Sequence, residues 1–97
     1  MALGRYKKTP TEVKRYSVEY SHWLDTSEYV SSVSFATIST NTGTITLTAD
    51  TIGASATSVS FLVSGGDDGQ TYEVAVTMVT SAGQTKQDAI FFVVEAL

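Results

Sequence analysis

The chain of 97 residues is long enough for one domain with a modest hydrophobic core, and nothing in it marks a second domain. It contains no Cys and one His, which excludes disulfide frameworks, thiolate zinc sites and cysteine nucleophiles and leaves little for metal or proton-relay chemistry. The longest apolar run, residues 89–94, is far shorter than the roughly 20 residues of a membrane-spanning helix, and no apolar segment of the signal-peptide kind follows the charged first residues.

Charge is distributed unevenly along the chain, although its formal total is only -4. Residues 1–15 hold five basic side chains and one acidic, a local balance of +4, whereas the remainder holds one basic and nine acidic, a balance of -8. An acidic body repels nucleic acid, so nucleic acid is not an expected partner. We expect the basic head to reach an acidic protein surface, with an ordinary solvated terminus as the alternative.

The first predicted element is an extended N-terminal arm over residues 1–12, which contains the only proline, Pro10. This stretch shows neither the alternation of a strand nor the period of a helix, so we place it before the domain, which then covers residues 13–97. We expect the arm to become ordered only when it docks on a partner. The candidate partner-binding residues in it are three basic side chains and its single aromatic: Arg5, Lys7, Lys8 and Tyr6.

After the arm, apolar residues alternate with polar ones in short segments separated by turn residues. In the clearest segment, Val59, Phe61 and Val63 share one face. Ser and Thr make up 27 of the 97 residues, and this richness in Thr beside Val, Ile and aromatic residues favours strands over helices. The predicted strands cover residues 13–21, 29–40, 44–48, 58–64, 70–80 and 85–94.

Turn signals lie between these strands. Residues 41–43, Asn-Thr-Gly, predict a tight hairpin turn, residues 65–69 form the strongest turn signal, and residues 81–83 close a hairpin before the last strand. Residues 50–57 are expected to connect two strands at the edge of a sandwich. Within the last strand, residues 90–94 are apolar on both faces, which places this strand either between two covered layers or half-exposed to a partner.

Strands at this spacing, joined by hairpin turns, predict an all-β fold. We expect an antiparallel sandwich of about six to seven strands rather than an α/β arrangement.

Candidate reactive groups are few. His22 has no second His and no carboxylate at motif spacing, so a catalytic role is not expected. Asp67 and Asp68 lack the ligand spacing of a calcium loop, and no predicted helix follows this Gly-rich turn to bind phosphate. The sequence therefore predicts no enzyme, no metal site and no cofactor. Trp23 is a candidate partner-binding residue, or alternatively a plug at the end of the sandwich.

Two sets of residues resemble known families. Residues 69–76, GQTYEVAV, followed by the turn at 81–83, resemble the penultimate strand of fibronectin type III and other immunoglobulin-like domains, and Tyr72 matches the position of their tyrosine corner. The layout of the chain resembles small tailed-bacteriophage virion proteins of the fiber-tail adaptor type. The segments that carry this second resemblance are residues 8–13, 16–21, 23–24, 61–66 and 69–83.

These resemblances imply an immunoglobulin-like sandwich and a non-enzymatic structural protein of the virion, assembled in the cytoplasm of the host bacterium. They imply an adaptor that docks on the tail or neck and links it to fibers through protein-protein contacts, in multiple copies per particle. Two alternatives remain open: a capsid decoration protein, and a host-surface or carbohydrate-binding module.

Overall fold

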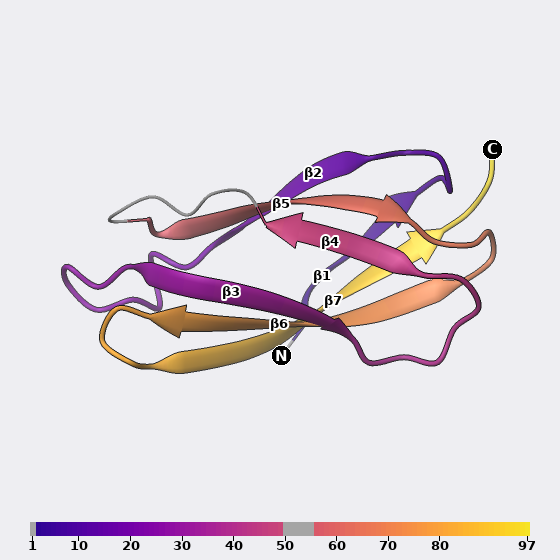
Figure 1. Ribbon diagram of the computed structural model, residues 1–97. Coiled ribbons are helices and arrows are strands. Elements are labelled where there is room, and N and C mark those ends of the chain that lie inside the picture. The colour runs from indigo at the N-terminus through magenta and orange to yellow at the C-terminus, as the bar shows by residue number, and fades with distance from the viewer. Residues whose placement is uncertain (1, 50–55) are drawn as a thin grey trace.

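The computed structural model describes residues 2–49 and 56–97, which form seven strands and no helix. The strands are β1 (Ala2–Lys8), β2 (Lys14–Glu19), β3 (Val30–Thr37), β4 (Ile45–Ala49), β5 (Ser58–Gly65), β6 (Thr71–Thr80) and β7 (Thr85–Val94). They build two stacked sheets, one in the order β1-β7-β6-β3 and the other in the order β2-β5-β4 (Figure 1). The predicted all-β sandwich is confirmed.

Alternation of side chains places one face of each sheet in the core. In β5 the side chains of Val59, Phe61 and Val63 are buried, on the face that the sequence predicts. Burying side chains of this kind contributes about 1.5–3 kcal/mol each, which is the main favourable term in folding. The buried apolar cluster between the sheets consists of Tyr20, Val30, Ile45, Val59, Phe61, Val63, Tyr72, Val74, Val76, Met78, Ile90, Phe92 and Val94.

The strand order is that of an immunoglobulin-like sandwich. Such domains pair their second, fifth and fourth strands in one sheet and their third, sixth and seventh in the other, as this chain does. The hydroxyl of Tyr72 accepts a hydrogen bond from the backbone N–H of Asp67 at 2.8 Å and donates one to the carbonyl of Thr42 at 2.6 Å. Tyr72 therefore connects its own strand to two loops through hydrogen bonds, as the tyrosine corner expected at this position does.

The structure corrects the prediction of a separate N-terminal arm. Residues 2–8 form β1, which pairs in parallel with β7 from Ala2 opposite Ala89 to Lys8 opposite Val94. β7 is thereby flanked by β1 on one edge and by β6 on the other. A parallel partner lies far away in the sequence and leaves no hairpin signal, so local patterns do not detect it.

The turn predicted at residues 41–43 also has a different role. β3 pairs with β6 and β4 pairs with β5, so this turn joins two sheets and the prediction of a hairpin here is wrong. Gly43 nevertheless has the positive φ, 72°, that its turn requires. The hairpin predicted between β6 and β7 is confirmed by their antiparallel pairing. Of the connection predicted at residues 50–57, residues 50–55 lie outside the described part of the chain.

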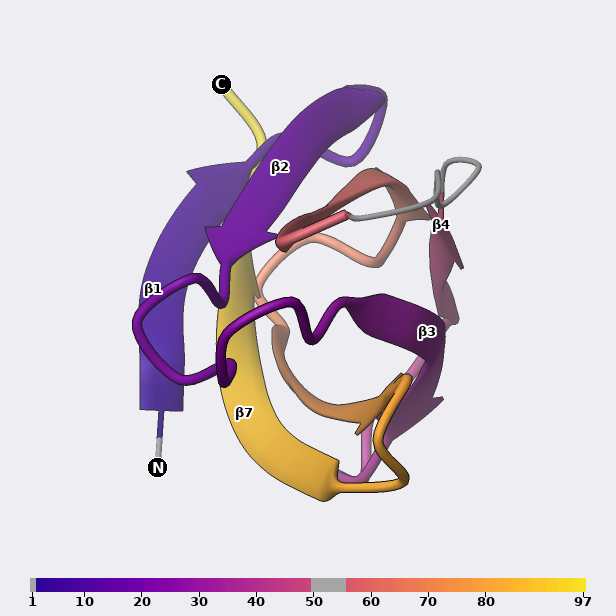
Figure 2. The same ribbon diagram turned by 90° about the vertical axis from the view of Figure 1, so that its left-hand side faces the viewer.

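The two sides of the sandwich are formed by different pairs of edge strands. β1 and β3 are the two edges of one sheet, and β2 and β4 are the two edges of the other. β1 and β2 lie on one side and β3 and β4 on the opposite side, as Figure 2 shows. This arrangement decides where the charged residues of the chain gather.

Candidate functional site

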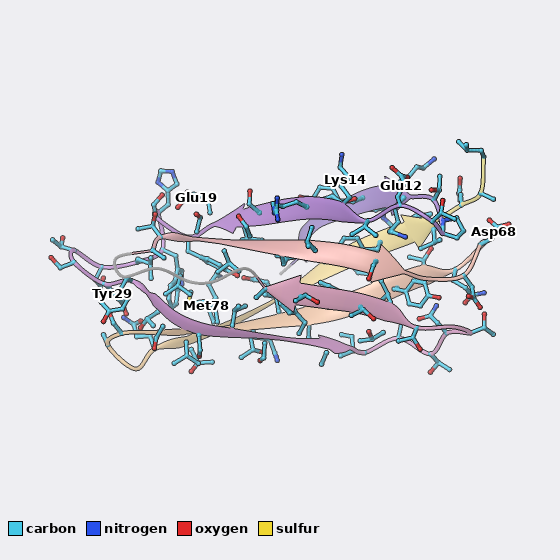
Figure 3. All side chains as sticks on the ribbon, turned by 45° about the horizontal axis from the view of Figure 1, so that its top comes forward. Glu12, Lys14, Glu19, Tyr29, Asp68 and Met78 are labelled. Carbon is cyan, nitrogen blue, oxygen red and sulfur yellow. The ribbon has the colours of Figure 1, made fainter. Side chains whose placement is uncertain are left out.

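The groups considered for metal binding and catalysis lie far apart. Asp68 lies at one end of the sandwich, whereas Glu19, which precedes the exposed His22 by three residues, lies at the other (Figure 3). Asp68 has a structural contact, since its Oδ1 accepts a hydrogen bond from the backbone N–H of Ala96 at 2.8 Å. In residues 2–49 and 56–97, no three His, Cys, Asp or Glu side chains are grouped so as to hold a metal ion. None of these residues belongs to a helix able to cross a membrane.

Two of the predicted partner-binding residues, Arg5 and Lys7, are exposed on β1. The guanidinium carbon of Arg5 lies 5.1 Å from the ring centroid of Phe91, on the outer face of the four-stranded sheet. Lys7 forms an ion pair with Glu95, with 3.8 Å between Nζ and Oε2, and 76% of its side chain remains exposed. An exposed pair of this kind adds little stability, so Lys7 stays available to a partner.

The other two candidates of this segment turn inward. The ring of Tyr6 lies 4.7 Å from that of Tyr16 and 6.1 Å from that of Phe92. Lys8 is buried, and its Nζ donates hydrogen bonds of 2.6 Å to the carbonyls of Thr9 and Gly65. Burial lowers the pKa of Lys8, although the carboxylate of Glu12 opposes this effect.

The inward orientation of these two side chains leaves Arg5 and Lys7 as the more accessible of the four predicted contact residues of this segment. Tyr6 fills space between the two sheets, and Lys8 satisfies backbone carbonyls next to the first strand. Both side chains serve the fold. The surface that β1 offers is therefore made by Arg5 and Lys7.

Trp23 lies in the loop between β2 and β3, apart from these residues. It is 36% exposed, so part of its ring is accessible at the surface. The Nζ of Lys86 lies 5.6 Å from its ring centroid and 3.4 Å from Oδ2 of Asp88. Lys86 and Asp88 occupy inward-facing positions near the start of β7. Phe91, which contacts Arg5, faces outward and lies later in the same strand. The predicted set is thus divided between two surfaces.

The loop that carries Trp23 is held by a buried carboxylate. Glu28 accepts hydrogen bonds from the hydroxyl of Thr80, from the backbone N–H of Asp25 at 2.9 Å and from the side-chain amide of Gln84 at 3.2 Å. The bond from Thr80 is the largest cause, followed by that from Asp25, of a pKa of Glu28 below its usual range. The loop therefore presents Trp23 from a fixed base.

Basic residues are concentrated on β1 and β2, the two edge strands that lie on one side of the sandwich. Arg5 and Lys7 lie on β1 and the exposed Lys14 and Arg15 on β2. We call these four residues the basic side. Glu12 lies in the turn between the two strands, where Figure 3 shows it near Lys14. The backbone N–H of Thr9 donates to its Oε1 at 2.7 Å, and this bond, aided by the nearby lysines, lowers the pKa of Glu12.

The sequence reveals only part of this surface. Lys14 and Arg15 contribute to the charge of the first 15 residues but are not among the contact residues that the sequence predicts. Asp25-x-x-Glu28 has the spacing of a capping box, in which the glutamate returns to the backbone N–H three residues earlier. The capping-box spacing can be recognised in the sequence and predicts that Glu28 holds this loop. The position of β1 beside β2 cannot be recognised there, because it depends on the pairing of β1 with β7 and of β2 with β5.

Comparison with known proteins is consistent with this architecture. Residues 8–93 match a family model described as podophage GP4 fiber-tail adaptor protein gp77. A search of the curated proteins found no significant match. Because the family model covers nearly all of the chain, the protein belongs to the podophage fiber-tail adaptor family, a family of structural proteins of the phage virion.

Proposed function

We propose that the chain is a non-enzymatic building block of the virion that docks on the tail or neck and links it to fibers through protein-protein contacts. The observation that carries this proposal is the basic side. The charges of the first 15 residues, which sum to +4, lie on β1, β2 and the turn between them, while the remainder of the chain has a balance of -8. Opposite charge speeds docking and orients it, so an acidic surface on a tail or neck protein is the expected partner.

The strands give this surface a fixed form. Arg5 lies against Phe91 and Lys7 beside Glu95, so both side chains are placed by β1 and its neighbour β7. Because the pairing with β7 fixes the backbone of β1, docking has to order only the exposed side chains and not the strand itself. With several copies in one particle, a modest affinity per copy is sufficient for stable attachment.

An adaptor also needs a second contact surface, and Trp23 is the proposed one. Trp is one of the residue types enriched among the anchors of protein interfaces, together with Tyr and Arg. Its loop is held by Glu28, and it lies beyond the end of β2 that is farthest from Lys14. We assign the basic side to the tail or neck and Trp23 to the fiber.

Incorporation of variants into phage particles tests the first contact. The double variant Arg5→Gln/Lys7→Gln should lose incorporation while its urea unfolding curve stays close to that of the wild type. The matched control, Thr40→Glu/Thr42→Glu, changes the net charge by the same amount at two exposed loop positions and should be incorporated normally. Normal incorporation of the glutamine variant would reject the basic side as the docking surface.

The second contact is tested by Trp23→Ala. Particles that carry this variant should retain the adaptor but lose fibers. If the variant instead keeps its fibers and loses binding on a glycan array, the carbohydrate-binding alternative replaces the assignment of Trp23 to the fiber.

A further inference from the structure

The side opposite to the basic side carries two free sheet edges. Within the described residues, β3 has β6 as its one strand neighbour and β4 has β5 (Figures 1 and 2). The outer edge of such a strand presents a row of backbone N–H and C=O groups that can pair with another strand. Natural proteins usually protect these edges with charged side chains, prolines or bulges.

The protection is distributed unequally between the two sides. β1 and β2 carry Arg5, Lys7, Lys14, Arg15 and Glu19. Residues 29–49, which include β3 and β4, contain no charged residue and no proline. The one irregularity in β3 lies at its start, between Val30 and Ser32, and the pairing from Ser32 to Thr37 is regular. The regular part of β3 is therefore an unprotected edge.

β3 is the better candidate for pairing because it is the longer strand. It has eight residues, whereas β4 has five, and short edge strands are themselves a form of protection. Beside β3 runs a cleft of about 230 Å³, lined by the apolar side chains of Phe35, Ile45, Leu47 and Val74 among others. This volume is below the 300–1,000 Å³ or so of small-molecule sites, so the cleft suits side chains of an added strand.

We propose that β3 pairs with β3 of a second copy of this chain, antiparallel and around a twofold axis at Ser34. This pairing joins two four-stranded sheets into one continuous sheet. Ser34 then lies opposite Ser34 of the second copy, and Val33 opposite its Phe35. A pair of an aromatic with a β-branched side chain is favourable across antiparallel strands, and the small uncharged serines at the axis introduce no repulsion. The proposal does not depend on the adaptor role.

The absence of charged residues on β3 favours a second copy of this chain as the partner of its free edge. A twofold axis brings residues near it against their own symmetry mates, so any charge there would face the same charge. Like charges directly opposite each other destabilise a strand pair. The same pairing at β1 or β2 would set Arg5 and Lys7, or Lys14 and Arg15, against their equivalents. β3 alone combines sufficient length with the neutrality that this symmetry requires.

Sedimentation equilibrium of the full chain, at concentrations up to about 1 mM, tests the proposal. The wild type should show a monomer-dimer equilibrium, and Ser34→Lys should raise the dissociation constant at least about tenfold. Ser34→Asp should do the same, and an equimolar mixture of the two variants should dimerise again because opposite charges then meet at the axis. Ser17→Lys, an exposed position on β2, is the control and should dimerise as the wild type does.

Three results would overturn the proposal. A wild type that is monomeric at every concentration would exclude pairing between two copies, and a strand of another protein would then be the expected partner of β3. A dimer unaffected by Ser34→Lys would lie on a different surface. Failure of the mixed variants to associate would exclude pairing at Ser34. Hydrogen exchange supplies a measurement that needs no variant. Within Ser32–Thr37 every second amide points away from β6, and the protection of these amides should rise with protein concentration. Constant protection contradicts the pairing.

Discussion

Tyr6 and Tyr16 lie ring to ring with their centroids 4.7 Å apart, although their strands belong to different sheets. Tyr16 also lies 5.5 Å from Phe92 and 6.3 Å from Phe61, one in each sheet. These rings close the sandwich along the side whose outward positions carry Arg5 and Lys7. Tyr6, which lies between Arg5 and Lys7 in the sequence, points inward and packs β1 against the other sheet.

The first prediction concerns this aromatic contact. Tyr6→Ala should destabilise the domain by about 1–3 kcal/mol, less than the 3–5 kcal/mol or so of a fully buried aromatic, because Tyr6 is only half buried. Urea unfolding measures the change. Arg5→Ala, on the neighbouring outward position, should change stability by no more than about 0.5 kcal/mol. Equal effects of the two variants would show that β1 is not part of the cooperatively folded unit.

The second prediction concerns the tyrosine corner. Tyr72→Phe removes the hydroxyl that bridges the backbone N–H of Asp67 and the carbonyl of Thr42. Leaving such partly buried groups without a partner costs about 1–3 kcal/mol. The control is Tyr29→Phe, which removes the hydroxyl of a tyrosine that is 38% exposed and should be nearly neutral in the same unfolding measurement. A neutral Tyr72→Phe would mean that water replaces the hydroxyl in both contacts.

Most of the fold could be predicted from the sequence because one pattern, alternation, decides both the strands and the faces that they bury. Val59, Phe61 and Val63 are buried as this pattern predicts. Alternation does not specify which strands pair. The turn containing Gly43 has the chemistry of a hairpin but joins β3 to β4 across the two sheets, since β6 and β5 are their partners.

The candidate site was less predictable for the same reason. Whether Tyr6 anchors a partner or packs against Tyr16 depends on the parallel pairing of β1 with β7, which no local pattern records. The separation of charge along the chain was visible in the sequence, and it predicted a distinct basic region. The tertiary structure places this basic region on two edge strands and buries Lys8 against two backbone carbonyls. Neither feature could be predicted from the sequence.

The third prediction compares two glycines of the loop between β5 and β6. Both have positive φ, 92° at Gly66 and 84° at Gly69, so alanine at either position costs about 1–2 kcal/mol in backbone strain. At Gly66 an added Cβ would also lie 2.8 Å from Cγ2 of Val94, whereas at Gly69 it meets nothing within 4 Å. Gly66→Ala should therefore be the more destabilising in thermal unfolding, by about another 1–3 kcal/mol.

A double-mutant cycle identifies the cause of that difference. Val94→Ala removes the methyl group that an alanine at position 66 would meet, so Gly66→Ala should cost less in that background than in the wild type. The cost of Gly69→Ala should be the same in both backgrounds. Identical costs of Gly66→Ala with and without the valine methyls would leave backbone strain and the 3.3 Å approach to Cε2 of Tyr72 as the cause of the effect.

The last prediction follows from the lowered pKa of Glu28. Hydrogen bonds from Thr80, Asp25 and Gln84 favour its carboxylate form in the folded chain, so its pKa lies below that of the unfolded chain. This stabilisation is complete above the ordinary pKa of glutamate and is lost as the pH falls through the lowered value. Emission of Trp23, the only tryptophan, should report the opening of its loop in acid.

Thr80→Val and Glu28→Gln separate this effect from general acid unfolding, to which Glu12 and Glu19 also contribute through lowered pKa values. Thr80→Val removes the largest cause of the shift but keeps the carboxylate, so the fluorescence transition should move to higher pH. Glu28→Gln removes the titrating group, so the loop should be less stable at neutral pH and depend less on acid. A transition at the same pH in the wild type and in Thr80→Val would mean that the carboxylate of Glu28 does not hold the loop of Trp23.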